Sequence, residues 1–189
     1  RIIAYHEAGH ALVQAKLPHC DPVHKVSIVA RGMAGGYTLT LPEDDRTLYS
    51  KSKFEDDMAG LLGGRVAEEI TFNDVTTGAS NDLRRATQLA RAMITEYAMS
   101  DNLGQRTFGQ KEELIFLGRE IAEQRDYSEE VASQIDREIR AIVDKAYNRA
   151  KEVIETNRQR LDLLAQRLIE RETLEGADFE AIVNGAVAA

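Results

Sequence analysis

HEAGH, at residues 6–10, lies within a segment whose apolar residues recur at helical spacing until Pro18 ends the run. On a helix, His6 and His10 differ in direction by only about 40°, so both imidazoles can reach one metal ion from the same face. Glu7 lies about 60° from His10 around the same helix, which brings it within reach of a water molecule at that ion. The pattern therefore predicts a helix that carries two zinc ligands and a general base.

The motif is rare enough to be informative. The chain has four histidines in 189 residues, and with that composition the expected number of HExxH matches is roughly 0.01. The simpler alternative is a pair of exposed histidines on an amphipathic helix. The small residues around the motif and its position on a predicted helix favour the metal site.

A catalytic zinc ion needs a third protein ligand and one open position. The longer pattern HExxHxxGxxH is absent, because Val13 and Lys16 stand where its glycine and third histidine would be. Other nitrogen and sulfur ligands follow Pro18 and would have to fold back toward the helix. These candidates are His19, Cys20 and His24.

Three carboxylates are further candidates for the third ligand. Glu68 and Glu69 end the segment GGRVAEE at 63–69, and Asp82 lies in TGASNDL at 77–83. Each has a simpler explanation: the helix dipole favours an acidic residue such as Asp82 in a first turn, and the two glutamates could form a solvated helix face. Spacing alone leaves the three carboxylates nearly equal.

Hydrophobic periodicity predicts a mainly α-helical chain with one small sheet. Alternation over 25–30 and 37–41, around a glycine-rich turn at 32–36, predicts a β-hairpin beside the metal helix. Ser52 and Glu55 form a capping-box pattern for the next helix. Ser80 or Asn81 would cap the helix that carries Asp82.

The second half of the sequence predicts a helical hairpin. Ser128 opens a long helix, Asn157 breaks it, and leucines at helical spacing from 161 to 168 mark an antiparallel partner. A short last helix is predicted over 179–183. We expect a single domain over 1–189, with a catalytic part at 1–104 and the helical hairpin and last helix at 128–189.

Composition narrows the class of protein. The net charge of −8 argues against nucleic acid or an anionic membrane surface as the main partner. The single cysteine excludes an internal disulfide and fits a reducing compartment. The longest uncharged run, Gly32 to Pro42, has eleven residues, too few for a membrane span. The sequence begins with Arg1, so we expect a piece of a longer protein or a processed product.

Six blocks, in order, resemble the protease domain of the FtsH family, the membrane-anchored ATP-dependent zinc metalloproteases. The blocks are AYHEAGHALV, LLGGRVAEEI, TTGASNDLRRAT, ARAMITEYAMSDNLG, FLGRE and RLDLLAQRLIERETL. The resemblance implies a zincin-like metallopeptidase in which His6 and His10 bind Zn²⁺ and Glu7 activates water. It also implies that Asp82 completes the zinc site, and Glu69 is kept as the alternative ligand.

The resemblance further implies a homohexamer at the cytoplasmic face of the bacterial inner membrane that degrades unfolded or membrane proteins. ATP and the membrane anchor would belong to upstream modules, since this sequence contains no GxxxxGK[ST] motif. Two other functions stay open: a non-catalytic assembly scaffold, and a stand-alone zincin peptidase. The strand at 26–30 is either a structural element or an exposed edge onto which a substrate adds as a further strand.

Overall fold

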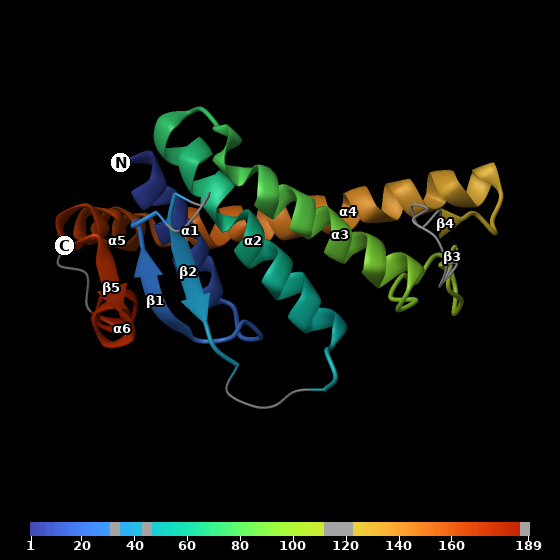
Figure 1. The fold of residues 1–189 in the computed structure, drawn as a ribbon, viewed down its shortest axis with the longest axis horizontal. Helices are drawn as coiled ribbons and strands as arrows, with labels where there is room; N and C mark the ends of the chain where they lie inside the picture. Colours follow the sequence, from blue (N-terminus) through green and yellow to red (C-terminus); the bar gives the residue numbers. More distant parts are fainter. Residues whose placement is uncertain (31–34, 43–46, 112–122, 186–189) are drawn as a thin grey trace, which may run out of the picture.

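The computed structural model describes residues 1–30, 35–42, 47–111 and 123–185. These residues form a mainly helical protein with one three-stranded antiparallel sheet and one two-stranded ladder (Figure 1). The elements are α1 (Ile2–Lys16), β1 (Val23–Ser27), β2 (Tyr37–Thr40), α2 (Lys51–Phe72), the 3-10 helix η1 (Thr77–Ala79), α3 (Ser80–Thr95), β3 (Gln110–Lys111), β4 (Glu123–Gln124), α4 (Glu129–Thr156), α5 (Arg158–Arg171), β5 (Thr173–Glu175) and α6 (Gly176–Asn184). Among the described helices, none has the length and apolar character needed to cross a membrane.

The mainly α-helical fold class with a small sheet is confirmed. Two predicted features fall partly or wholly outside the described residues: the glycine-rich turn at 32–36 and the block FLGRE at 116–120.

Helix α1 lies at the centre of the molecule. It is buried without interruption from Ala4 to Val13, and it packs against α2, α4, α5 and β1. Its backbone approaches α2 closely where two glycines meet: a Cβ atom on Gly9 would lie 2.4 Å from the carbonyl oxygen of Gly63. The two glycines are therefore needed for this crossing, which fixes the position of α2 relative to the histidine-bearing helix.

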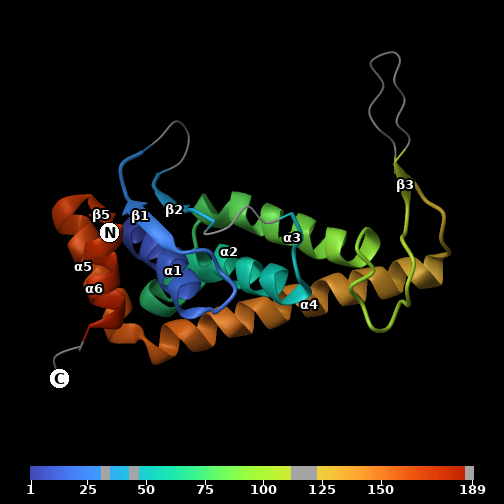
Figure 2. The ribbon, with the colours of Figure 1, turned by 90° about the horizontal axis from the view of Figure 1, so that it is seen from below.

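Helix α4 supports the other helices along its length. Figure 2 shows it running beneath α1, α2 and α3, and the packing contacts agree. As predicted, Ser128 caps α4 by accepting a hydrogen bond from the Val131 backbone N–H, and the helix ends at Asn157. The predicted antiparallel pairing needs correction: α5 follows α4 directly, but it packs mostly on α1 rather than along α4.

The predicted β-hairpin is present, but it gains a third strand. The strand order is β2-β1-β5, and Val26 of β1 pairs with Thr38 on one side and Leu174 on the other. Of the two alternatives for the strand at 26–30, the exposed edge is therefore wrong. The residues of β5 take up that edge, and β2 and β5 are the two strands whose outer edges are unpaired among the described residues.

Two predicted helix starts need correction. Helix α2 is capped by Ser50, which accepts from the Lys53 N–H, so the cap is two residues earlier than Ser52; the carboxylate of Glu55 instead accepts from Lys145 of α4. Neither Ser80 nor Asn81 caps α3, because that helix continues directly from η1. The side-chain cap belongs to η1, where Thr76 accepts from the Gly78 N–H.

Candidate metal centre and cleft

His6, His10 and Asp82 lie together in the structure. The Nε2 atoms of the two histidines are 2.9 Å apart, and Oδ2 of Asp82 lies 3.5 Å from Nε2 of His6 and 3.4 Å from Nε2 of His10. The two histidines come from consecutive turns of α1, and Asp82 comes from the first turn of α3. Within the described parts of the chain, this is the one group of three such side chains close enough to share a metal ion.

Hydrogen bonds on the far side of each imidazole fix its orientation. Nδ1 of His6 lies 2.6 Å from Oε1 of Glu68, and Nδ1 of His10 lies 2.8 Å from the carbonyl oxygen of Gly60. A carbonyl oxygen can only accept, so Nδ1 of His10 carries the proton. Its Nε2 lone pair then points toward the cluster. The carboxylate of Glu68 likewise holds the proton on Nδ1 of His6. The Nε2 atom of His6 therefore also faces the cluster, and the carboxylate makes this histidine a stronger ligand.

The space between the three side chains fits a zinc ion. Tetrahedral ligands at the usual zinc distances lie about 3.3 Å from one another, close to the separations of 2.9, 3.4 and 3.5 Å found here. This space exists because residue 64 is glycine: a Cβ atom there would lie 2.5 Å from Nε2 of His10 and 2.7 Å from Nε2 of His6. The donor set of two imidazoles and one carboxylate also suits zinc.

The carboxylate of Glu7 lies beside this cluster and against the sheet. The hydroxyl of Thr38 on β2 is 3.3 Å from Oε2 of Glu7 and is placed to donate to it. Burial raises the pKa of Glu7 above its ordinary value, although the neighbouring histidines oppose the shift. Gly36 leaves room for this side chain, since a Cβ atom there would lie 2.8 Å from Cγ of Glu7. Glu7 is therefore held in an environment typical of a general base.

The charges of the cluster are strongly coupled. Burial tends to raise the pKa of Asp82, but hydrogen bonds from His10 and His6 outweigh it and hold that pKa well below its usual range. Burial tends to lower the pKa of His6, and its contacts with Asp82 and Glu68 reverse the shift and raise it. A carboxylate that stays ionised beside two imidazoles is ready to bind a cation.

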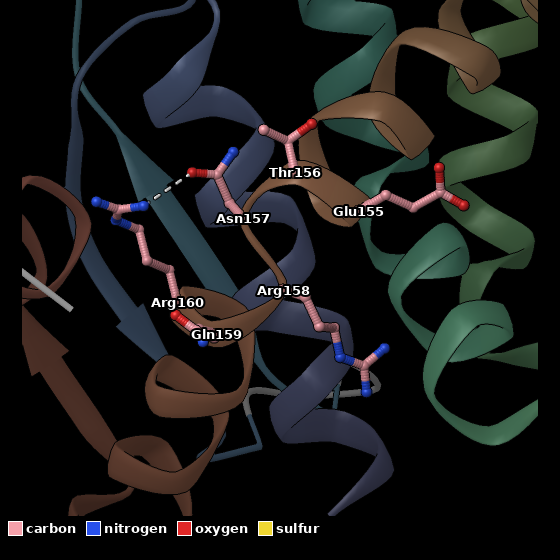
Figure 3. A pocket seen from close by; sticks show the side chains of 6 residues that line it. All are labelled: Glu155, Thr156, Asn157, Arg158, Gln159 and Arg160. Carbon is pink, nitrogen blue, oxygen red and sulfur yellow. Dashed lines mark hydrogen bonds between the residues drawn. The ribbon is translucent and has the colours of Figure 1, made fainter. Parts of the chain in front are cut away.

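The cluster opens into a cleft of about 790 Å³. Its walls come from α1, from β2 and the two glycines before it, from α2, and from η1 with the start of α3. A second, smaller hollow of about 250 Å³ lies where α4 meets α5. In Figure 3 its side chains diverge, and the one hydrogen bond drawn joins Arg160 to Asn157. The larger cleft is therefore the candidate active site.

The other predicted ligands lie outside the cluster. Nδ1 of His19 is 2.8 Å from Oδ2 of the buried Asp56, and His24 is exposed on β1. Burial raises the pKa of Cys20 to about 12, which makes its thiol a poor metal ligand. Glu69, the alternative third ligand, faces α4 and accepts a hydrogen bond of 2.7 Å from the hydroxyl of Tyr147.

The sequence did not predict the roles of two residues that support the site. Glu68, considered only as a ligand, lies behind His6, and its second oxygen accepts from the backbone N–H of Thr76. Its carboxylate thus joins α1 to the segment that leads into α3. Thr38 gave no signal, because a threonine in an alternating strand is ordinary. Its contact with Glu7 depends on how the sheet packs against α1.

The sequence model of peptidase family M41 matches residues 1–182 of the chain. The chain belongs to peptidase family M41. It is also 59% identical to the ATP-dependent zinc metalloprotease FtsH 1 of Sphaerobacter thermophilus, over 95% of this chain and 27% of that protein. The FtsH 1 protein of Thermomicrobium roseum is 58% identical over 95% of the chain and 28% of its own length.

A relative from Thermotoga maritima, named ATP-dependent zinc metalloprotease FtsH, is 51% identical over 97% of the chain and 30% of its length. The chain thus spans less than a third of the length of these curated relatives. Membership of peptidase family M41 agrees with the cleft described above.

Proposed function

We propose that residues 1–189 form a single zinc-dependent endopeptidase domain, with His6, His10 and Asp82 as the protein ligands of the metal. The observation that carries this proposal is the convergence of two imidazole Nε2 atoms and one carboxylate oxygen within 4.8 Å of one another, beside the buried Glu7. Membership of peptidase family M41 and the names of the relatives, which are zinc metalloproteases, support the same chemistry.

The residues around the metal cluster have distinct roles in peptide hydrolysis. Zinc, when bound, supplies a Lewis acid that polarises the peptide carbonyl and lowers the pKa of water. Glu7 accepts a proton from the attacking water and later returns it to the leaving amine. Thr38 orients the Glu7 carboxylate, and Glu68 with the carbonyl of Gly60 keeps the imidazoles aimed at the metal.

The substrate binds in extended form along β2. This strand lines the cleft through Tyr37 and Thr38, and its outer edge has unpaired backbone groups among the described residues. An extended peptide can therefore add to the sheet beside Glu7. β1 lies in the middle of the sheet, so the strand at 26–30 does not take this role.

The parent protein is proposed to be an ATP-dependent, membrane-anchored protease at the cytoplasmic face of a bacterial inner membrane, acting on unfolded or membrane proteins. This follows from the resemblance and from relatives named ATP-dependent FtsH proteases. Self-association as a homohexamer is part of the same proposal. An exposed patch supports self-association: Tyr49 stacks on Phe54, which stacks on Tyr97, and both tyrosines are 51% exposed.

Three variants test the assignment of Glu7 and of the third metal ligand. Glu7→Gln is expected to keep zinc and the fold but to lose nearly all peptidase activity, because an amide cannot take the proton. Asp82→Ala is expected to lose zinc, whereas Glu69→Ala keeps it. Zinc content after dialysis and hydrolysis of an unfolded protein substrate are the measurements. Zinc loss in Glu69→Ala but not in Asp82→Ala, or full activity in Glu7→Gln, would contradict the assignment.

A further inference from the structure

One cationic side chain of the cleft has no role in the site described so far. Arg85 lies on α3 three residues after Asp82, and both line the cleft. Residues three apart on a helix share a face, so the guanidinium is carried on the same wall as the carboxylate of the metal cluster. The side chain is exposed, and a peptide in the cleft can reach it.

Arg85 is also free to bind a ligand. In the described part of the structure it forms no ion pair or hydrogen bond, although three carboxylates line the same cleft. Each of those carboxylates contacts other groups. Glu7 accepts a hydrogen bond from Thr38, and Glu68 contacts His6 and the backbone N–H of Thr76. Asp82 contacts the two histidines.

The charge balance of the cleft allows a further carboxylate to bind. With a divalent metal ion in place, the charges of Glu7, Glu68 and Asp82 are offset by the metal together with Arg85. A guanidinium binds carboxylates with two parallel hydrogen bonds, which gives selectivity as well as attraction. Apolar side chains also line the cleft; these are Ile2, Ile3 and Leu61.

We propose that Arg85 is a specificity-determining residue that binds a carboxylate of the substrate peptide close to the scissile bond. This inference rests on the proposed peptidase function. The carboxylate comes either from an acidic side chain or from the C-terminus of the peptide, and the two sources share the same chemistry at Arg85.

Peptide binding to the uncleaving Glu7→Gln protein, loaded with zinc, tests the proposal without relying on catalysis. The probes are short unstructured peptides with a fluorescent label, identical except for one Glu or Gln that is moved along the sequence. A second pair differs only in a free or amidated C-terminus. Fluorescence anisotropy gives the dissociation constants at low and high salt.

We expect at least one Glu peptide to bind about five- to tenfold more tightly than its Gln counterpart, with the difference shrinking at high salt. Adding Arg85→Gln should bring this ratio close to one, and Arg85→Glu should reverse it, so that the Gln peptide binds more tightly than its Glu counterpart. Arg84→Gln is the matched control, since Arg84 is an exposed neighbour on α3 that does not line the cleft. If the free C-terminus alone shows the effect, the carboxylate bound is the terminal one.

The outcomes separate the two proposals. The inference is overturned if no carboxylate-bearing peptide is preferred, if no peptide binds, or if the preference survives Arg85→Gln. An Arg85-dependent preference in a protein whose Glu7-containing form cleaves no peptide would support the inference and contradict the peptidase function. Zinc content and the urea midpoint of the Arg85 variants are measured as well. These measurements distinguish loss of the metal or of stability from loss of the carboxylate preference.

Discussion

Replacing Gly64 by alanine should remove the metal site while leaving the fold in place. The new Cβ atom would lie 2.5 Å from Nε2 of His10 and 2.7 Å from Nε2 of His6, whereas ordinary van der Waals contacts begin at 3.4 Å. The imidazoles must therefore move by about 0.7–0.9 Å. Metal sites tolerate departures of only about 0.2 Å in ligand distance, so we expect zinc affinity to fall at least 100-fold.

The stability of the metal-free protein should change much less. Overpacking costs about 1–3 kcal/mol, but alanine is about 1 kcal/mol more favourable than glycine inside a helix. The two effects partly cancel, so the free energy of unfolding without metal should fall by no more than about 2 kcal/mol. This contrast distinguishes a blocked site from a protein that does not fold.

Urea unfolding with and without zinc measures both quantities. At a zinc concentration 1,000 times the parent dissociation constant, binding stabilises the parent by about 4.1 kcal/mol. A variant that binds 100-fold more weakly gains only about 1.4 kcal/mol at the same concentration. The matched control is Gly176→Ala at the start of α6, away from the metal cluster, where the added Cβ would lie 3.3 Å from the carbonyl oxygen of His24. Equal zinc stabilisation of Gly64→Ala and the parent would refute the reasoning.

Three further predictions concern Glu68, Asp56 and Cys20. Glu68→Gln should weaken zinc binding about 10- to 100-fold in a chelator competition, while Glu69→Gln leaves it unchanged; the reverse order would exclude Glu68 as the support of His6. Asp56→Asn should lower the free energy of unfolding in urea by about 1–3 kcal/mol, because the buried carboxylate accepts from His19 and Arg149, and a loss below 0.5 kcal/mol would contradict this. Cys20, whose burial raises its pKa to about 12, should react with iodoacetamide at pH 8 roughly 100- to 1,000-fold more slowly in the folded than in the urea-unfolded chain, and equal rates would show an accessible thiolate.

Local patterns predicted those features that depend on a single element. The i, i+4 spacing of His6 and His10 places both imidazoles on one face of any helix, so their meeting needed no tertiary information. The cap at Ser128 and the break at Asn157 are equally local. Glycines inside a helix, such as Gly63 and Gly64, are costly unless close packing requires them, and here α1 and the two histidines do require them.

Features that depend on how elements meet could not be predicted. Glu68 and Glu69 differ by about 100° around α2, and only the packing of α2 decides that the first faces His6 and the second Tyr147. The strand β5 has three residues, too few for alternation to reveal it, and its pairing turned the supposed edge at 26–30 into the middle of the sheet. The role of Arg85 also depends on the shape of the cleft.

The position of β1 between β2 and β5 has a consequence for biosynthesis. Ser27 and Thr173, which hydrogen-bond across the sheet, are 146 residues apart. At about 5–20 residues per second, a ribosome needs about 7–30 s to make the intervening chain. During that time the nascent α1 lacks both α5 and the strand that closes the sheet, so its apolar surface is open to chaperones and to aggregation. The last stage of folding must therefore wait for late-synthesised residues to dock on an early-synthesised helix.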